Sequence, residues 1–389
     1  MRFALIGPSA PFRGGIAEYH DRLAEALATA GHRVRRLSFR RMYPRLLFPG
    51  RTQYVDPPAD GGGPGGPAAL PPPEAILDSV GPASWLVVAR RAAEAEVAVV
   101  EWWHPFFAPA FGAIAALLHR RGVPTIFVCH NLDPHEPMPG GGWLAARALG
   151  RAAAFVAQSG RDAARLRRTH PGRPVAVVLP PAPPPPPPCP HGGERDGCAA
   201  ALGIPAAPRR LLFFGYVREY KGLPTLIEAL GRLDVDVQLV VAGEIYHHDA
   251  GHYRASAARL GVGDRVVIMD RFVAPAEVGC CFHASDLVVL PYWEASQSAV
   301  VPLAMASGRA VVATRVGGLP DLVHDGVTGL LVAPRDSAAL ADAIARALAA
   351  RDAMGRAARD AAAGLDWRAA ARTLAELAAT AICGPAGPC

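Results

Sequence analysis

The sequence predicts an α/β protein built from two doubly wound parallel-sheet domains. Short apolar runs alternate with amphipathic helical stretches, and this series occurs twice along the chain. A proline-rich segment separates the two series, and the 389 residues, of which 51% are hydrophobic, suffice for two cores. In such a protein the cleft between the domains is the expected ligand site.

In the first half, short apolar runs predict strands, namely Phe3–Ile6, Val97–Val100, Thr125–Cys129 and Ala154–Ala157. Longer stretches with helical periodicity predict helices at Ile16–Ala30, Phe106–Arg121 and Gly142–Arg151. The Gly- and Pro-rich tract from Asp56 to Pro73 predicts a disordered insertion.

The two halves are divided at residues 181–198, where a run of prolines continues into a stretch containing Gly and Cys. Polyproline is a stiff segment outside any core, whether it acts as a spacer or is an expanded surface loop. We therefore expect an N-terminal domain over 1–180 and a C-terminal domain over 199–365. A last helix over 366–380 is expected to pack back toward the N-terminal domain.

The C-terminal domain shows the same pattern of apolar runs and helices. Its predicted strands are Leu211–Phe214, Val237–Ala242, Val266–Met269, Leu287–Pro291, Ala310–Thr314 and Gly329–Val332.

Charge is unevenly distributed between the halves. Residues 1–188 hold 21 arginines and 13 acidic residues, a net charge of +8, whereas residues 189–389 hold 18 arginines, one lysine and 21 acidic residues, a net charge of −2. The basic half predicts an anionic partner, such as a membrane surface, a lipid phosphate or an acidic saccharide, although a solvated basic surface would carry the same charge. Nucleic acid is not expected, because no recognition helix, zinc finger or aromatic-basic strand motif accompanies the charge.

The sequence predicts a cytoplasmic protein that approaches the inner face of the membrane. No uncharged apolar stretch is long enough to span a bilayer, and the first apolar run is too short for the core of a signal peptide. The seven cysteines include no Cys-x-x-Cys pair, which predicts reduced thiols and neither a disulfide framework nor a zinc site.

Lys221 is the only lysine among the 40 basic residues. It follows the apolar run Leu211–Phe214 and Gly215, and it precedes the amphipathic stretch Leu223–Leu233. Arg218 and Lys221 are therefore expected in the loop at the carboxyl end of a strand, where open α/β sheets bind anions. A lysine ammonium is a compact charge on a flexible stem, which suits a phosphate oxygen.

Gly14 and Gly15 stand between the first predicted strand and the helix that follows it. Backbone amides at such a helix start can approach a phosphate or a sugar closely, although a plain tight turn would use the same residues. The sequence contains no Gly-x-Gly-x-x-Gly and no Walker lysine. Dinucleotide oxidoreductases and P-loop enzymes are therefore not favoured.

Polar side chains cluster directly after the predicted strand Thr125–Cys129. They are His130, Asn131, Asp133, His135 and Glu136. Such a cluster at the carboxyl end of a strand indicates a site rather than core packing. A metal is not expected, because the two histidines are five residues apart in a loop that contains proline. The histidine-rich stretch 246–253 has no fixed helical register and is interpreted as a polar loop.

A further strand, loop and helix run from Leu287 to Gly308 and lead into Thr314-Arg315-Val316-Gly317-Gly318. The loop offers four polar side chains before the helix, from Glu294, Ser296, Gln297 and Ser298. Small polar residues at this position can bind anions and hydroxyl groups.

Together these segments resemble the nucleotide-sugar glycosyltransferases of family 4, which have the two-domain GT-B fold. The resemblance spans nearly the whole chain and implies that the C-terminal domain binds the donor, a nucleoside-diphosphate sugar. It also implies that Arg218 and Lys221 neutralise the donor diphosphate and that His130 faces the transferred sugar. The other residues implied in donor binding are Gly215, Glu294, Ser296, Gln297 and Ser298.

The same resemblance implies that the N-terminal domain binds the acceptor. Its acceptor or phosphate loop is expected to use Gly14, Gly15, Asn131 and Glu136. The implied acceptor is a saccharide or a lipid-linked molecule in the assembly of cell-surface polysaccharide or glycoconjugates. The resemblance further implies a hexosyl transfer that retains the anomeric configuration and requires neither a metal nor another cofactor.

The donor loop departs from the usual pattern of the family, in which two glutamates stand seven residues apart. Leu303 occupies the place of the second glutamate, and Glu294 lies one residue before the place of the first, at Ala295. The chain resembles a branch with a Gln- and Ser-rich loop, so the nucleotide stays open. Two alternative functions also stay open: a nucleotide-sugar epimerase on the same fold, and a non-catalytic binding subunit.

Overall fold

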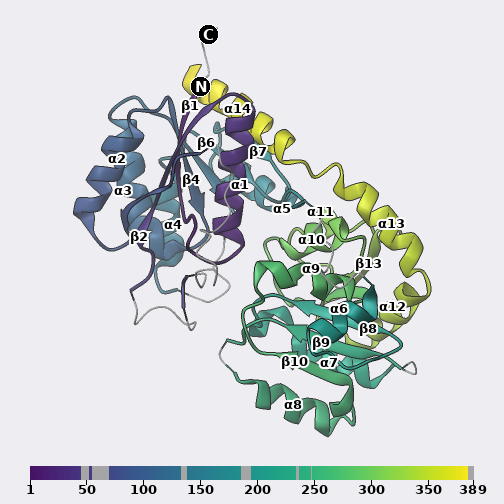
Figure 1. Cartoon of the computed structure of the whole chain (residues 1–389). Helices are drawn as coiled ribbons and strands as arrows, with labels where there is room; N and C mark the ends of the chain where they lie inside the picture. Colours follow the sequence, from purple (N-terminus) through teal and green to yellow (C-terminus); the bar gives the residue numbers. More distant parts are fainter. Residues whose placement is uncertain are drawn as a thin grey trace. The chain divides into compact units, whose positions relative to one another are not determined.

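The computed structural model describes residues 1–44, 52–54, 70–132, 138–184, 194–233, 236–246 and 248–383. The chain forms two compact units (Figure 1). Unit 1 contains Met1–Leu179 together with the chain from Trp367 onward, and unit 2 contains Pro180–Asp366. Unit 1 is therefore assembled from both ends of the sequence.

Unit 1 contains a seven-stranded parallel sheet in the order β3-β2-β1-β4-β5-β6-β7. The strands are β1 (Arg2–Ile6), β2 (Arg33–Arg41), β3 (Glu74–Asp78), β4 (Val97–Trp102), β5 (Thr125–Cys129), β6 (Ala154–Ala157) and β7 (Val175–Val177). The sequence predicted four of them and missed β2, β3 and β7. In β2 the segment RVRRLSFRR has five arginines, which hide a strand whose buried positions are only Leu37, Ser38 and Phe39.

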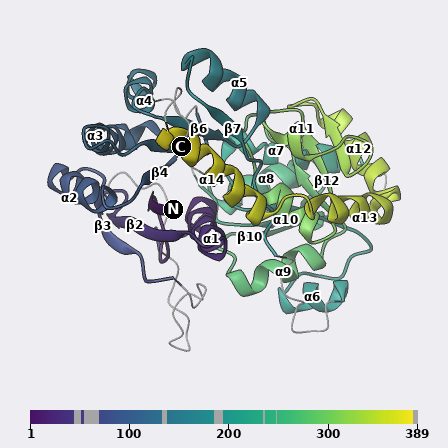
Figure 2. The same cartoon turned by 90° about the horizontal axis from the view of Figure 1, so that it is seen from above.

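Helices cover both faces of this sheet. One face carries α1 (Gly15–Thr29) and α14 (Trp367–Cys383), whose apolar residues share a core with β1, β4 and β5. The other carries α2 (Pro82–Ala92), α3 (Ala108–His119), α4 (Gly141–Leu149) and α5 (Gly160–Thr169), with a short 3₁₀ turn at Pro105–Phe107. Figures 1 and 2 show α14, in yellow, beside α1, in purple.

Unit 2 contains a six-stranded parallel sheet in the order β10-β9-β8-β11-β12-β13. The strands are β8 (Arg210–Phe214), β9 (Gln238–Ala242), β10 (Val266–Met269), β11 (Leu287–Leu290), β12 (Ala310–Thr314) and β13 (Gly329–Val332). All six lie where the apolar runs predicted them. Buried runs of Val, Leu and Ile are typical of parallel strands covered on both faces.

One face of the second sheet packs on α7 (Leu223–Gly231), α8 (Ala250–Arg259) and α12 (Ser337–Ala349). On the other face Phe214 contacts Phe282 of α9 (Pro275–His283), with ring centroids 5.0 Å apart. The remaining helices are α6 (Arg195–Ala201), α10 (Val300–Ala306), α11 (Leu319–Leu322) and α13 (Arg351–Ala362), with 3₁₀ turns at Glu219–Lys221 and Gly263–Arg265. The predicted linker was too long at its end, because α6 already begins at Arg195.

Each sheet has one point at which the strand order reverses. In unit 1 this switch point lies between β1 and β4, and in unit 2 it lies between β8 and β11. The loops that leave the carboxyl ends of these strands diverge to opposite faces, which opens a space for a ligand. The expected sites are therefore the loops after β1 and β4 and those after β8 and β11.

No helix in the described part of the chain is long and apolar enough to cross a membrane. Cys129, Cys198, Cys280 and Cys281 are buried and form no disulfide, but Cys383 is disulfide-bonded. The prediction that all thiols are reduced is therefore wrong at Cys383.

Candidate functional site

In unit 2, the loop after β8 lies directly against the loop after β11. Gly222 has a φ of +69°, and a Cβ at this position would lie 2.0 Å from the carbonyl oxygen of Pro291. The Trp293 N–H donates to the Tyr220 carbonyl at 2.7 Å. Only glycine permits both the left-handed backbone and this close approach, so Gly222 holds the two loops together.

The loop after β12 joins the same group. Gly317 has a φ of +53°, and a Cβ there would lie 1.7 Å from the carbonyl oxygen of Ala295. The Gly318 N–H donates to the Ser296 carbonyl at 2.8 Å. The Val-Gly-Gly segment thus fixes the backbone of the loop that carries Ser296, Gln297 and Ser298.

Two cations stand on these joined loops. The guanidinium carbon of Arg218 lies 4.9 Å from the ring centroid of Tyr246, and the Nζ of Lys221 lies 5.5 Å from that of Tyr292. Lys221 makes no ion pair with a carboxylate of the described residues. Its Nζ lies 3.4 Å from the point where a Cβ on Gly215 would stand. A side chain at Gly215 would therefore crowd the ammonium.

The surroundings of Lys221 disfavour its charged form. Desolvation by burial, with a smaller contribution from the positive charge of Arg218, lowers the pKa of Lys221 to about 7. A bound anion would compensate both effects. This is the electrostatic character expected of an anion-binding site.

The four polar residues of the loop after β11 differ in their surroundings. The Ser298 side chain is buried, where its hydroxyl accepts the Val300 N–H at 3.2 Å, and the Glu294 side chain is exposed. Ser296 and Gln297 are half-buried, and the Gln297 Oε1 is buried without a hydrogen-bond partner in the described structure. A buried acceptor without a partner is costly, so Gln297 is the residue of this loop that most needs a donor from a ligand.

The loop after β9 also contributes to this group of loops, which was not predicted from the sequence. Gly243 approaches Gly215 so closely that a Cβ would lie 2.1 Å from the Gly215 carbonyl oxygen. Glu244 is buried, and its carbonyl accepts the Val217 N–H at 2.9 Å. A Gly-Glu pair directly after an apolar strand was the available signal.

In unit 1, His130 lies inside the molecule at the carboxyl end of β5. It is only 2% exposed, and its Nε2 lies 2.7 Å from Oε2 of Glu101 while its Nδ1 lies 3.1 Å from Oε1 of Gln158. The ring of Tyr19 packs edge-on against the imidazole at 4.8 Å. Both ring nitrogens are therefore occupied by side chains of the same unit, and the role of His130 toward a sugar stays a prediction.

Glu101 is the centre of this buried polar cluster. It is the penultimate residue of β4 and has no exposed side-chain surface, and its Oε1 lies 3.6 Å from Nδ1 of His20. Burial alone would raise the pKa of Glu101, but the hydrogen bond from His130 and the proximity of His20 lower that pKa below its ordinary value. The carboxylate is thus ionised at neutral pH. Gly7 leaves room for it, since a Cβ on Gly7 would lie 2.6 Å from the Glu101 Cγ.

The sequence analysis missed the members of this cluster other than His130. Both ring nitrogens of His20 and the Nε2 of Gln158 lack hydrogen-bond partners in the described structure. A lone carboxylate ending the otherwise apolar run Val97–Trp102 was the signal that could have identified Glu101.

The glycine pair lies where the sequence predicted it. Gly14 has a φ of +113° and precedes α1, and no atom of the described residues lies within 4 Å of the position of a Cβ on it. There is therefore space beside Gly14, directly before the amide end of α1, which begins at Gly15. Asn131 is half-buried beside His130. Glu136, the remaining predicted member of this site, lies outside the described residues.

The described residues contain no group of three or more His, Cys, Asp or Glu side chains arranged to hold a metal ion.

Sequence families match most of the chain in two segments. The model for Glycosyltransferase Family 4 matches residues 13–184, and the model for glycosyl transferases group 1 matches residues 208–350. The chain belongs to glycosyltransferase family 4. The first segment contains β2 to β7 of unit 1, and the second contains all six strands of unit 2.

Several curated relatives of this family 4 chain are named D-inositol 3-phosphate glycosyltransferase. The one from Corynebacterium diphtheriae is 34% identical over 210 residues, which is 51% of this chain and 49% of the relative. The one from Corynebacterium glutamicum is 36% identical over 218 residues, which is 54% of this chain and 52% of the relative. The chain thus spans about half the length of the relatives it matches.

Solved structures resemble this family 4 chain over nearly its whole length. They include a sucrose-phosphate synthase from Thermosynechococcus elongatus (TM-score 0.70, 21% identity, 97% of this chain and 98% of that one). A glycosyltransferase from Rickettsia africae has a TM-score of 0.71 at 16% identity, covering 98% of each chain. Anabaena HepE in complex with UDP has a TM-score of 0.68 at 17% identity, covering 97% of this chain and 99% of that one. The two all-parallel sheets thus have the GT-B fold.

Proposed function

We propose that this chain is a retaining glycosyltransferase that moves a hexose from a nucleoside-diphosphate sugar to a saccharide or lipid-linked acceptor. The observation that carries the proposal is the position of Arg218 and Lys221, on joined loops at the switch point of unit 2. HepE, which shares the fold, was solved with UDP and with UDP-glucose. That precedent supports a nucleotide-sugar donor for this chain.

In the proposed reaction, the bond between the anomeric carbon and the diphosphate oxygen breaks, and a bond from the same carbon to the acceptor oxygen forms on the same face of the sugar. The departing phosphate oxygen takes the proton of the acceptor hydroxyl. Negative charge grows on the diphosphate as it leaves, and Arg218 and Lys221 stabilise that charge from fixed positions. This arrangement needs no metal or other cofactor, and turnover is expected to persist in EDTA.

The proposed acceptor side is unit 1, whose open α1 terminus and Glu101–His130 pair lie at its own switch point. The relatives named D-inositol 3-phosphate glycosyltransferase support the proposal that an acceptor of this chain carries a phosphate. We place the chain in the assembly of cell-surface polysaccharide or glycoconjugates.

We further propose that unit 1 contacts an anionic membrane at the cytoplasmic face. Trp143 on α4 is 67% exposed, and the guanidinium of Arg147 lies over its ring at 5.8 Å. A groove of about 340 Å³ between α3 and α4 is lined by these residues and by Arg151. An exposed indole beside arginines is suited to the interface between lipid headgroups and acyl chains.

The experiment that tests the function has two stages. A thermal-shift screen of nucleoside diphosphates should identify one base that raises Tm, because a ligand that binds only the folded state stabilises it. Incubation of the matching nucleotide sugars with candidate acceptors, followed by NMR, should then show a product with the anomeric configuration of the donor. Conversion of the nucleotide sugar without an acceptor would indicate an epimerase. Selective binding without turnover on any acceptor would indicate a binding subunit.

A further inference from the structure

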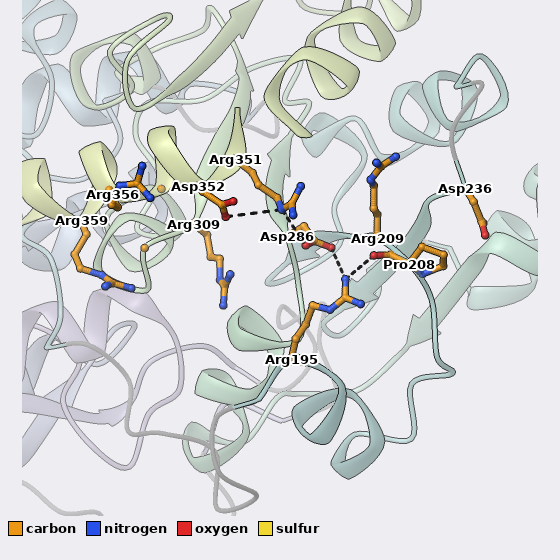
Figure 3. A pocket seen from close by; sticks show the side chains of 12 residues that line it. Arg195, Pro208, Arg209, Asp236, Asp286, Arg309, Arg351, Asp352, Arg356 and Arg359 are labelled. Carbon is orange, nitrogen blue, oxygen red and sulfur yellow. Dashed lines mark hydrogen bonds and ion pairs between the residues drawn. The ribbon is translucent and has the colours of Figure 1, made fainter. Parts of the chain in front are cut away.

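Unit 2 contains a second candidate site, a pocket of about 810 Å³ (Figure 3). Its lining residues Arg209, Asp286 and Arg309 directly precede β8, β11 and β12. The pocket therefore lies at the amino ends of the parallel strands, whereas Arg218 and Lys221 follow a carboxyl end. These are two separate places on one unit.

The pocket is strongly basic. Six arginines and three aspartates line it, which gives a net charge of +3. The arginines are Arg195, Arg209, Arg309, Arg351, Arg356 and Arg359.

The acidic residues neutralise only part of this set. Asp286 pairs with Arg195 at 3.1 Å and with Arg351 at 3.6 Å, and Arg351 also lies 3.9 Å from Asp352. Figure 3 shows this chain of contacts across the middle of the pocket. The side chains of Arg209, Arg356 and Arg359 have no hydrogen bond or ion pair with any described residue.

Two of the arginines are held by packing instead of by acids. Gly308 has a φ of +65°, and a Cβ on it would lie 2.3 Å from Nη2 of Arg359. The guanidinium of Arg359 therefore lies on bare backbone. Arg309 donates to the carbonyl of His283 at 3.3 Å, but its Nε is buried without a partner. Burial lowers the pKa of Arg309, and the charge of Arg359 lowers it further.

A chain with 39 arginines has many on its surface, and most of those are simply solvated. The six pocket arginines differ because they line one concavity, and three of their side chains have no partner among the described residues. In addition, Arg309 has a buried Nε–H without an acceptor. Guanidinium groups bind phosphate oxygens with paired hydrogen bonds, so a phosphate ligand would satisfy both the charge and the missing acceptor.

We propose that this pocket binds a multiply charged phosphate anion of the diphosphate class, at a site separate from the joined loops of unit 2. The anion has two sources with the same chemistry, a free polyphosphate anion or the phosphate headgroup of a lipid. Arg356 and Arg359 are its main partners, and Arg309 supplies the buried donor.

The test measures binding of inorganic pyrophosphate by isothermal titration calorimetry at low salt. Because the joined loops would also bind pyrophosphate, all proteins carry Arg218→Gln and Lys221→Gln. This background should still bind pyrophosphate, and adding Arg356→Gln and Arg359→Gln should weaken binding at least about tenfold, the scale of lost charge-assisted hydrogen bonds. A matched control carries Arg254→Gln and Arg259→Gln on α8, which remove the same charge from exposed positions outside the pocket.

Absence of binding in the background protein, or an equal loss in the control, overturns the proposal. If the double pocket variant fails to fold by circular dichroism, the exposed Arg356→Gln alone replaces it and should show a smaller loss in the same direction. Sedimentation with phosphatidylcholine vesicles that contain phosphatidic acid distinguishes the source. Vesicle binding that weakens when Arg356 and Arg359 are replaced identifies a lipid headgroup, and pyrophosphate binding with vesicle binding unaffected by these substitutions identifies a free anion.

Discussion

The Lys221 ammonium has a pKa of about 7 because it is desolvated and lies near Arg218. A diphosphate bound beside it would favour the charged form and raise this pKa. Above pH 7, therefore, the empty site holds a mostly neutral lysine and the occupied site a charged one. Binding of a nucleoside diphosphate should take up a proton.

We predict that the affinity for the nucleoside diphosphate falls as the pH rises above about 7, because the proton required for binding becomes scarcer. Calorimetry in buffers with different ionisation enthalpies should show uptake of nearly one proton at about pH 8. Lys221→Arg should abolish this uptake, since a guanidinium stays protonated over the whole range. Equal uptake in the variant would assign the proton to another group.

Lys221→Ala should lower turnover by about two to three orders of magnitude, the scale seen when one fixed charge stabiliser is lost. Lys221→Arg should restore only part of it, because a planar fork places its charge differently from an ammonium. Turnover with the identified donor is measured for both variants, and circular dichroism checks that both are folded. Full activity of Lys221→Arg would show that the single lysine has no specific role.

Glu101 and His130 form a buried hydrogen-bonded pair, and Glu101→Gln leaves the neighbouring histidines without a carboxylate. At neutral pH this substitution should lower the free energy of unfolding by about 3–5 kcal/mol. Because the pKa of Glu101 is lower in the folded protein than in the unfolded chain, its contribution is present above about pH 4 and is lost as the pH falls through the folded value. Urea unfolding at several pH values should therefore show that the free energies of unfolding of the wild type and the variant become similar only in acid.

His130→Ala should abolish transfer while nucleoside-diphosphate binding, which belongs to unit 2, stays nearly unchanged. Turnover and calorimetric affinity are measured on the same folded variant. If the variant unfolds or keeps near-normal turnover, His130 is a structural residue that satisfies Glu101.

At the residue scale, the sequence shows which groups carry charge but not which of them are buried together. Arg218 and Lys221 could be found because they share one short loop with a glycine. Glu101, His20 and Gln158 are separated by long stretches of chain, and only the pairing of β1, β4, β5 and β6 brings them to His130.

At the scale of elements, the joined loops of unit 2 depend on glycines at positions where a side chain would collide with backbone. Gly222→Ala should therefore separate the loops after β8 and β11, lowering both Tm and nucleoside-diphosphate affinity. Gly261→Ala is the matched control, because Gly261 has the same φ of +69° with nothing within 4 Å of its Cβ position. Both variants place an alanine at the same positive φ, but only in Gly222→Ala does the new Cβ collide with the carbonyl oxygen of Pro291.

Thermal unfolding and calorimetry measure the two variants side by side. Similar losses of Tm, with affinity retained in both, would mean that the contact with Pro291 does not organise the site.

Strands were predictable where burial on both faces requires continuous apolar residues, as in all six strands of unit 2. Prediction failed for β2, where long arginine side chains cover the strand while keeping their charges at the surface. It also failed for β7, which has only three residues and none fully buried. Such elements are fixed by their neighbours in the sheet, which a local pattern does not show.

At the scale of the whole molecule, the basic N-terminal half and the exposed Trp143 predict binding to anionic liposomes. Binding should weaken as salt is added, because screening reduces the attraction of arginines to the surface. Trp143→Ala should weaken it further by about tenfold or more, the scale of an indole removed from an apolar contact. Leu260→Ala, at an exposed apolar position of unit 2, is the control and should have no effect. Absence of binding at low salt would contradict the prediction.

The return of α14 to unit 1 sets an order of events during protein synthesis. The ribosome completes every element of unit 2 before it releases the helix that covers Tyr19, Leu23 and the neighbouring strands. Unit 1 therefore becomes complete only after unit 2 has been synthesised, and a nascent chain ending at Leu179 lacks the helix that covers this apolar face. Until the seventeen residues of α14 have been synthesised, that apolar face stays open to chaperones or to aggregation, so we expect unit 1 to complete its folding only when α14 is available.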